Sequence, residues 1–322
     1  MSLTAIAPRT RPLPLRALSA LTTFALGTLA TLSPLTAIIL LGWLMRVMRH
    51  RTLTARGHAP AHPPRWITGP PGSGWLARPL GGLAANIRTG LSATLSLALA
   101  TLPFSVLWLT SWWAGWENSF NKGYEQAAIG PLTGLLGVAV FATIMIYLPM
   151  ALAHQAAEAR AFALFELRRV RSATAHAGWG LAALAAATLI LAFPLFAARG
   201  LPVFAEGIAP RVAEMTSAEL AGLKDTIRLA TGAYLFLSCL FLKRWSAGLY
   251  ARAVLRAQAG RDAALWNGAP STARRPHGHL IRLPLLFAIW VGFAFLIFVG
   301  QFLNHAWVAW VTHPLVFLPW VV

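Results

Sequence analysis

Long apolar stretches separated by polar connectors dominate the pattern of the 322-residue chain. A helix needs about 20 apolar residues to cross the hydrocarbon core of a bilayer. Five stretches approach or exceed this length, and they run over residues 91–113, 132–153, 179–198, 227–242 and 283–303. We therefore predict an all-α fold, a polytopic membrane helix bundle with five transmembrane helices.

A further apolar stretch, residues 17–48, precedes them and is longer than one crossing requires. Ser33 and Pro34 lie near its middle, and proline interrupts a helix because it lacks a backbone N–H and clashes with the preceding turn. We interpret the stretch as an N-terminal helical hairpin that turns at these two residues and returns to the side from which it entered. A single kinked helix, which would give six spans in total, is the alternative.

Charge is distributed unevenly over the polar connectors. The chain carries 27 Lys and Arg against 9 Asp and Glu. One alternating set of segments, residues 1–16, 46–88, 154–178 and 243–282, holds 22 of the basic and 3 of the acidic residues. Since positively charged connectors stay in the cytoplasm, we predict a multi-pass protein of a bacterial cytoplasmic (inner) membrane with a periplasmic or extracellular C-terminus. The charge then faces lipid headgroups, and no nucleic acid partner is expected.

The organisation of the chain follows from the same pattern. Residues 1–16 form a basic cytoplasmic N-terminus, and residues 17–322 a single integral membrane domain. Within it, we predict a cytoplasmic loop over residues 49–90, because proline and glycine recur there and break regular structure. Residues 304–322 form an apolar, aromatic tail that we expect to lie along the outer surface of the membrane or to dip into it.

Two cytoplasmic segments have the spacing of amphipathic helices. Apolar residues recur every three to four positions over 152–170 and again over 245–254, beside arginines. Basic amphipathic helices are typical of segments that lie on an anionic leaflet. We therefore predict two amphipathic helices on the cytoplasmic surface, with anionic phospholipid as a partner of Arg168, Arg169, Arg171, Arg244, Arg252 and Arg256.

Tryptophans cluster on what the charge pattern makes the outer side. Because the indole ring prefers the headgroup level of a bilayer, we expect these residues at the outer interface between membrane and water. They are Trp108, Trp112, Trp113 and Trp116 near the end of one predicted span, and Trp307 and Trp310 in the tail.

Three short segments resemble a known family. Leu41–Arg49 contains the sequence Gly-Trp-Leu-Met-Arg and precedes the proline-rich loop, and Tyr147–Ala151 leads into Phe162–Phe165. In this order the segments resemble a prokaryotic multi-pass inner-membrane family that is catalogued only as a domain of unknown function. The resemblance covers about residues 17–198. It implies a fold and a location, but it brings no activity to any residue.

Residues that could carry catalysis or hold a cofactor are few. The chain has no glycine-rich phosphate loop and no nucleophile-elbow motif. All nine acidic residues lie outside the predicted spans, where a proton pump would place some. His154 and His305 end predicted spans in apolar, aromatic surroundings, so they are the candidates for binding haem or chlorophyll, although a histidine at a helix end more often packs at the interface. No cofactor and no metal site are predicted.

These observations lead to a functional hypothesis. We expect a non-enzymatic accessory or organising protein of the inner membrane, in contact with anionic lipid and with other membrane proteins or further copies of itself. The alternative is a transporter or channel, because Pro103 and Pro194 interrupt helices at corresponding places of a weak internal repeat. The two hypotheses differ in whether polar groups line a path through the bundle.

Overall fold

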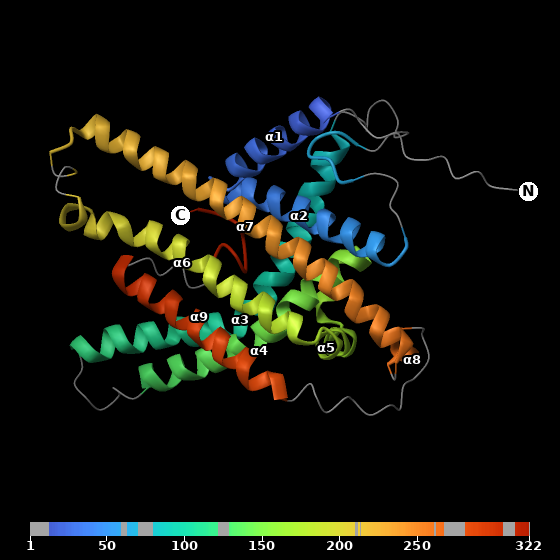
Figure 1. Ribbon diagram of the computed structural model, residues 1–322. Helices are drawn as coiled ribbons and strands as arrows, with labels where there is room; N and C mark the ends of the chain where they lie inside the picture. The colour runs from blue at the N-terminus through green and yellow to red at the C-terminus, as the bar shows by residue number, and fades with distance from the viewer. Residues whose placement is uncertain are drawn as a thin grey trace, which may run out of the picture.

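A computed structural model describes residues 13–58, 63–69, 80–121, 129–209, 212, 214–260, 262–266, 281–304 and 313–321 of the chain. All regular elements in this part are helical (Figure 1), which confirms the all-α prediction. The longer helices are α1 (Leu13–Ala30), α2 (Pro34–Ala55), α3 (Gly81–Asn121), α4 (Ile129–Glu158), α6 (Trp179–Ile208), α7 (Ser217–Ala259) and α9 (Leu283–Asn304). The short ones are η2 (Ala163–Phe165), α5 (Leu167–His176) and α8 (Ala263–Trp266).

Five helices of the described chain are long and apolar enough to cross a membrane, namely α1, α3, α4, α6 and α7. An apolar part of α9, Leu283–Val299, is shorter. Four predicted spans coincide with α3, α4, α6 and α7, and the fifth coincides with α9. The chain is therefore a multi-pass membrane protein built as a helix bundle.

The third helix, α3, illustrates how the bundle divides lipid-facing from protein-facing residues. One face exposes apolar side chains at intervals of three or four residues: Leu91, Leu95, Leu99, Leu102, Val106 and Leu109. The opposite face is buried in the bundle: Ala93, Leu97, Phe104 and Trp108. Because soluble proteins rarely expose apolar patches of this extent, the exposed face fits contact with lipid chains.

The first apolar stretch is broken at its proline. α1 ends at Ala30 and α2 begins at Pro34, with Ser33 in an extended conformation before it. The two helices form a V, and the start of α1 and the end of α2 lie toward the same side of the bundle (Figure 1). The structure therefore agrees with the hairpin rather than with a single span, although α2 continues as far as Ala55.

Backbone carbonyls freed at this turn are bonded by distant parts of the chain. The N–H of Val321 donates to the oxygen of Thr31 over 2.8 Å, and the Arg228 guanidinium donates to the oxygen of Leu32 over 2.7 Å. The last carbonyls of a helix have no partner inside it. The hairpin turn is therefore held by α7 and by the C-terminal segment, residues 313–321.

The C-terminal segment lies inside the bundle (Figure 1). Leu315, Val316 and Phe317 are buried, and the Cys239 thiol lies 3.6 Å from the carbonyl oxygen of Pro314. For this part of the tail, insertion rather than a position along the surface is the correct alternative.

Helices α2 and α3 approach each other closely at two glycines. A methyl group on Gly42 would lie 1.8 Å from the carbonyl oxygen of Asn86, and one on Gly90 would lie 2.0 Å from that of Ile38. A larger residue at either position would require a backbone to move. The glycine of the Leu41–Arg49 segment thus has a packing role, and the close crossing brings Arg46 next to α3.

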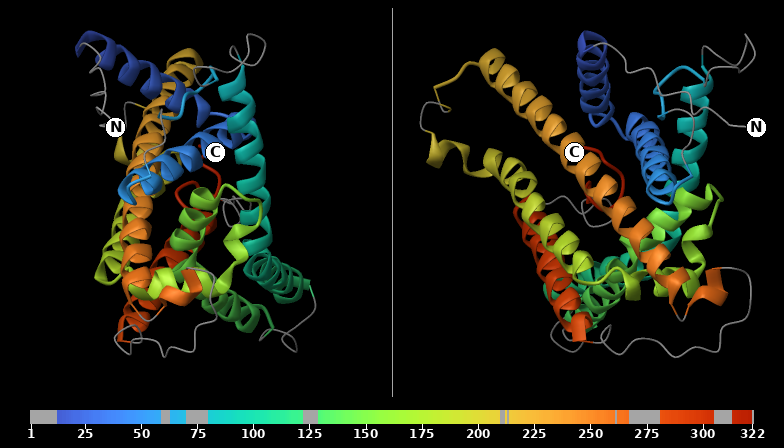
Figure 2. Two further views of the ribbon diagram at one scale, coloured as in Figure 1. Left: turned by 90° about the vertical axis from the view of Figure 1, so that its right-hand side faces the viewer. Right: turned by 45° about the vertical axis from the view of Figure 1, so that its right-hand side comes forward.

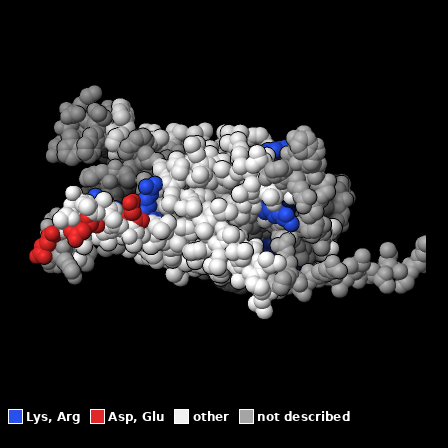
Figure 3. All heavy atoms as spheres, turned by 90° about the horizontal axis from the view of Figure 1, so that it is seen from above, with Lys and Arg blue, Asp and Glu red and all other residues white. Residues whose placement is uncertain are grey.

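The helix ends gather at two sides of the bundle. The C-terminal ends of α2 and α7 lie at one side with α5 and α8, and we call this side the basic end (Figure 1). α6 and α9 lie side by side along the bundle (Figure 2), and the connection from α6 to α7 lies at the opposite end. On the face shown in Figure 3, acidic side chains are confined to one end, and only basic side chains are visible at the other.

Candidate functional site

A charged network follows α4, where the chain makes a strained turn. α4 ends at Glu158, and Ala159 and Phe162 then have φ angles of 52° and 62°. A residue with a Cβ atom loses about 1 kcal/mol in this region, so surrounding contacts must hold the turn. The continuous amphipathic helix predicted over 152–170 is therefore wrong, because α4, η2 and α5 share this segment and the turn brings Glu166 back toward α4.

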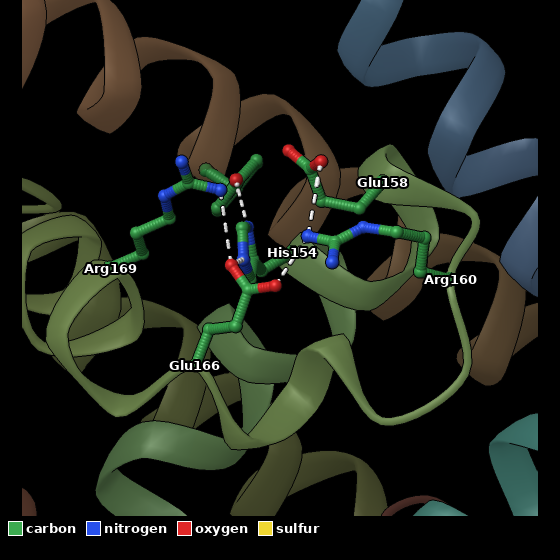
Figure 4. Close-up of polar contacts among 6 residues, drawn as sticks. His154, Glu158, Arg160, Glu166 and Arg169 are labelled. Carbon is green, nitrogen blue, oxygen red and sulfur yellow. Dashed lines mark hydrogen bonds and ion pairs between the residues drawn. The ribbon is translucent and has the colours of Figure 1, made fainter. Parts of the chain in front are cut away.

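His154 of α4 is the centre of this network (Figure 4). Its side chain is fully buried. Nε2 lies 2.9 Å from Oε2 of Glu166, and Nδ1 lies 2.7 Å from the hydroxyl oxygen of Tyr250. An ionised carboxylate only accepts hydrogen bonds, so Nε2 donates to Glu166 and the Tyr250 hydroxyl donates to Nδ1. The arrangement defines a neutral imidazole with both nitrogens satisfied.

Glu166 joins this imidazole to two guanidinium groups. Arg160 donates to one carboxylate oxygen, Arg169 donates to the other over 3.1 Å, and Arg160 also lies 3.6 Å from Glu158. Burial would raise the pKa of Glu166, but the hydrogen bonds from His154 and Arg160 outweigh it and hold the pKa below its usual value. Two carboxylates therefore balance two arginines.

Trp266 of α8 connects the network to a second polar group. Its ring packs edge-on against His154, with the ring centroids 5.9 Å apart. Its indole N–H donates to the hydroxyl of Ser172 over 3.2 Å, and that hydroxyl donates to Asp262. Asp262 also lies 3.7 Å from the imidazole of His176. These contacts tie α4, α5 and α8 together.

The geometry of this network fits a structural role. His154 has no free nitrogen for a ligand, so it does not fit an axial ligand of haem or chlorophyll, and His305 lies outside the described residues. In the part of the chain that the structure describes, no group of three or more His, Cys, Asp or Glu is placed to hold a metal ion. We refer to His154, Tyr250, Glu166, Arg160 and Arg169 as the paired network.

A second feature of the basic end is a cleft of about 650 Å³ between α1, α2, α7 and residues 63–69. Its lining includes three arginines and one histidine: Arg51, Arg65, Arg244 and His50. No Asp or Glu is among the described residues that line it. We call it the basic cleft, because its positive charge is not balanced from within.

Hydrogen bonds from α2 and α3 hold residues 63–69 in place as one wall of this cleft. The Arg46 guanidinium donates to the carbonyl oxygen of Arg65 over 3.2 Å and to the side-chain oxygen of Asn86 over 2.7 Å. The amide nitrogen of Asn86 donates to the carbonyl oxygen of Trp66 over 2.9 Å. Arg46 therefore fixes residues 63–69 against α2 and α3.

Two tryptophans add apolar surface to the cleft. The rings of Trp43 and Trp66 stack with their centroids 4.5 Å apart, and both residues line the cleft. The loop predicted over residues 49–90 is thus wrong at both ends, because α2 continues to Ala55 and α3 begins at Gly81. Its proline-rich middle is also partly packed against the bundle.

Several polar groups at the cleft have no partner within the described residues. Nε1 of Trp43, Nε1 of Trp66 and Nδ1 of His50 are buried without a hydrogen bond. Arg51 and Arg244 are exposed and form no ion pair with a described residue. Burial and the neighbouring Arg244 lower the pKa of His50, so its ring is uncharged near neutral pH.

A buried lysine lies in the middle of the bundle. Lys243 lines a cavity of about 40 Å³ with Leu315 and Val316 of the C-terminal segment and with apolar side chains of α2, α4, α6 and α9. Its ammonium group forms no hydrogen bond or ion pair with a described residue. The sequence places Lys243 in a polar connector, and this is wrong because α7 continues past Leu242, where the predicted span ends, and buries the side chain.

The second predicted amphipathic helix is part of α7 rather than a separate element. Residues 245–254 continue the helix, and Leu249 and Tyr250 are buried against protein. Arg169 is half-buried because it is bonded to Glu166. The other arginines expected to contact lipid are exposed, and for them the contact stays a prediction: Arg168, Arg171, Arg244, Arg252 and Arg256.

The predicted interface tryptophans have different positions. Trp108 is fully buried among three phenylalanine rings, so the interface prediction is wrong for it, because the face of α3 that carries it points into the bundle. Trp112 and Trp113 are exposed, as contact with headgroups requires. The side chains of the remaining three lie outside the described residues: Trp116, Trp307 and Trp310.

The sequence singles out His154, Arg169 and Arg244, but not Glu166, Arg51 or Arg65, which complete these sites. Glu166 is 12 residues from His154, a separation that places them together only after the turn. Arg65 and Arg244 approach Arg51 through the fold alone. A signal did exist for Arg46, which directly follows the Gly-Trp segment that packs on α3.

The chain matches no protein-family model, no curated protein and no solved structure. The resemblance to a family of unknown function therefore stays a prediction.

Proposed function

We propose that the chain is a non-enzymatic accessory or organising protein of a bacterial cytoplasmic membrane, which binds anionic phospholipid through its basic end and contacts other membrane proteins or further copies of itself. One observation supports this most. The described carboxylates of the basic end, Glu158, Glu166 and Asp262, are all engaged within the protein. Its exposed arginines therefore present a net positive surface.

The strength of such a surface can be estimated. Each Lys or Arg near an anionic leaflet contributes about 1 kcal/mol, so a handful of exposed arginines suffices to hold the basic end at the headgroups. Positively charged connectors also stay in the cytoplasm during insertion. Both effects favour the same orientation, with the basic end in the cytoplasm.

Contact with other proteins is supported by the length of α7. It has 43 residues and runs straight (Figure 1), so it is about 60 Å long at 1.5 Å per residue. The hydrocarbon core is only about 30 Å thick. α7 is therefore long enough to extend outside the lipid core, where it offers surface to partners.

Orientation and partnership can be tested on the intact protein. A reporter fused after Gly260 is expected to report the cytoplasm, and one after Asn118 the opposite side; reversed signals would contradict the orientation. Purification in mild detergent is expected to retain a stoichiometric partner or a defined oligomer. Recovery of a lone monomer that turns over a small substrate would contradict the accessory role.

A transporter is the second candidate, and the position of Lys243 is the observation that favours it. An ionisable residue inside a membrane bundle commonly marks a path for ions or substrates. Proteoliposomes that contain the purified protein test this candidate. Saturable solute flux that is lost in Lys243→Met would favour transport, whereas absence of flux with a retained partner would favour the accessory role.

A further inference from the structure

We propose that the basic cleft is a binding site for one anionic phospholipid, whose phosphate lies among Arg51, Arg65 and Arg244. The inference deepens the proposed function and rests on it. It replaces a diffuse attraction between a basic surface and a leaflet by a defined site with one occupant.

The charge of the cleft fits a phosphate. Arg51 comes from α2, Arg244 from α7 and Arg65 from residues 63–69, so three separate segments bring guanidinium groups to the same cleft. Guanidinium groups match phosphate oxygens in charge and in paired hydrogen bonds. Since no described acidic residue lines the cleft, a bound anion would relieve the mutual repulsion of the arginines.

The polarity of the cleft changes along α2 in the way a phospholipid requires. Thr54, Arg51 and His50 line one part, and Val47 and Trp43 line the other. From first to last these residues span about 16 Å of helix at 1.5 Å per residue. The polar part suits a headgroup and the apolar part suits the start of the acyl chains, whereas a free phosphate would use only the polar part.

Residues of α1 and α7 extend the apolar part of the cleft toward the surrounding lipid. Leu26 of α1 and Leu240 of α7 join the apolar part. α1 also exposes Leu18 and Leu21 on its surface, so a lipid-facing helix borders the cleft. A volume of about 650 Å³ is within the usual range of ligand sites, about 300–1,000 Å³.

Two residues that line the cleft carry donors without a partner in the described chain. The indole Nε1 atoms of Trp43 and Trp66 are buried without a hydrogen bond, and Trp43 is only 6% exposed. An indole N–H can only donate, and a buried donor left unpaired costs about 1–3 kcal/mol. A small rotation of either ring toward the cleft would let a phosphate or ester oxygen of a phospholipid accept from it.

The site can be tested by native mass spectrometry of the delipidated full-length protein in detergent. The probes are dioleoyl phosphatidylglycerol, dioleoyl phosphatidylcholine with the same chains, and inorganic phosphate. We expect one phosphatidylglycerol to bind at least 10-fold more tightly than phosphatidylcholine. The site variant Arg51→Gln/Arg65→Gln/Arg244→Gln should lose at least 10-fold in affinity.

A matched control removes the same charge from the same end of the molecule. Arg168→Gln/Arg171→Gln/Arg252→Gln should change the affinity for a single lipid less than 2-fold, because these residues lie outside the cleft and their predicted contact is with the surface of a leaflet, which is absent in detergent. An equal loss in both triple variants would overturn the site and leave only diffuse attraction, as in the proposed function. Equal binding of both lipids would overturn both ideas, and tight binding of phosphate without lipid preference would show a soluble anion to be the ligand.

A second variant guards against an indirect effect of charge removal or misfolding. Thr23→Trp narrows the cleft from α1 and keeps every charge. It should also weaken phosphatidylglycerol binding at least 10-fold while the thermal unfolding temperature without lipid stays unchanged. Undiminished binding in this variant would place the lipid elsewhere and overturn the proposal.

Discussion

The paired network and the basic cleft use the same residue types at the same end of the molecule, but they differ in how their charges are arranged. In the paired network, Arg160 and Arg169 meet the Glu166 carboxylate, and His154 has both nitrogens bonded. In the basic cleft, Arg51 and Arg244 have no described counter-charge. The first arrangement is complete within the protein, whereas the second lacks a described counter-charge and is the proposed lipid site.

The difference shows why counting arginines does not locate a lipid site. A surface ion pair contributes little to stability. The carboxylate of the pair also offsets most of the attraction between its arginine and an external anion. Six arginines were predicted to contact lipid, and Arg169 among them is engaged with Glu166. Conversely, Arg51 and Arg65, which line the cleft, stand outside the predicted amphipathic helices.

Removing the Glu166 carboxylate should cause the largest loss of stability among the changes that separate the paired network from the basic cleft. Glu166→Ala leaves two guanidinium groups and the Nε2–H of His154 without their acceptor, which should destabilise the protein by about 2 kcal/mol. Thermal unfolding in detergent measures this. Glu158→Gln, which removes one longer ion pair with Arg160 at 3.6 Å, is the control and should cost less than about 0.5 kcal/mol. Equal losses of unfolding free energy in the two variants would show that Glu166 is no more important to the network than Glu158.

A smaller loss is expected at the other side of the imidazole. Tyr250→Phe removes the hydroxyl that donates to Nδ1 of His154 over 2.7 Å, and should cost about 1 kcal/mol. Lipid affinity should be unchanged, because Tyr250 does not line the cleft. A change in lipid affinity without a change in unfolding temperature would contradict the separation of the two features.

The pH dependence of stability should reveal the same carboxylate. The pKa of Glu166 is lower in the folded protein than its ordinary value of 4.5. Its contribution is therefore complete above pH 4.5 and is lost as the pH falls through the folded pKa. Unfolding temperatures measured between pH 7 and pH 3.5 should fall more steeply for the native sequence than for Glu166→Gln. Identical slopes would exclude Glu166 as the source.

Lipid binding should depend on pH in the opposite direction. Burial and Arg244 on α7 lower the pKa of His50 and disfavour its protonation, and Arg51 on α2 and Arg65 of residues 63–69 line the same cleft. A bound phosphate would favour protonation of His50, so phosphatidylglycerol affinity should rise a few-fold from pH 7.5 to pH 5.5. The rise should vanish in His50→Gln. A rise that persists in this variant would point to another group.

The smallest expected effect concerns the turn that closes the paired network. Ala159 has a φ of 52°, and glycine adopts this conformation without the steric cost that alanine bears. Relief of this steric cost, about 1 kcal/mol, is partly offset by the greater freedom of glycine in the unfolded chain, so Ala159→Gly should stabilise the protein by about 0.5 kcal/mol. A clear loss of stability would show that the turn is not strained.

Hydrophobic pattern was sufficient to predict the bundle. The apolar stretches locate α4, α6 and α9 within a few residues at one end or both, whereas α3 and α7 extend well beyond their predicted spans at both ends; Pro34 marks the break in the first stretch. These predictions succeed because burial in lipid requires long apolar helices, a signal that is local in sequence.

The helix boundaries at the basic end could not be predicted in the same way. No glycine or proline between Met150 and Gly178 announces the turn at Ala159, because that turn is imposed by contacts with Glu166. Lys243 and the arginines after it suggest that the span ends at Leu242, yet α7 continues because its apolar face packs on protein.

The basic cleft was unpredictable for a further reason. Its lining comes from α1, α2, α7 and residues 63–69, which are far apart in sequence and polar only in part. The hydrogen bonds from Arg46 and Asn86 that hold the connector depend on the close crossing of α2 and α3. Only the folded chain brings these groups together.

We propose that unbalanced charge in one cleft, rather than the total charge of the basic end, selects lipid. This can be tested by photo-crosslinking of the protein in bilayers with a phosphatidylglycerol that carries a diazirine near the start of an acyl chain, followed by mapping of the labelled residues. Labels should concentrate at Leu26, Val47 and Leu240, and Thr23→Trp should remove them. Labels spread evenly over exposed apolar faces such as Leu91–Leu109 of α3, and unaffected by that substitution, would contradict the proposal.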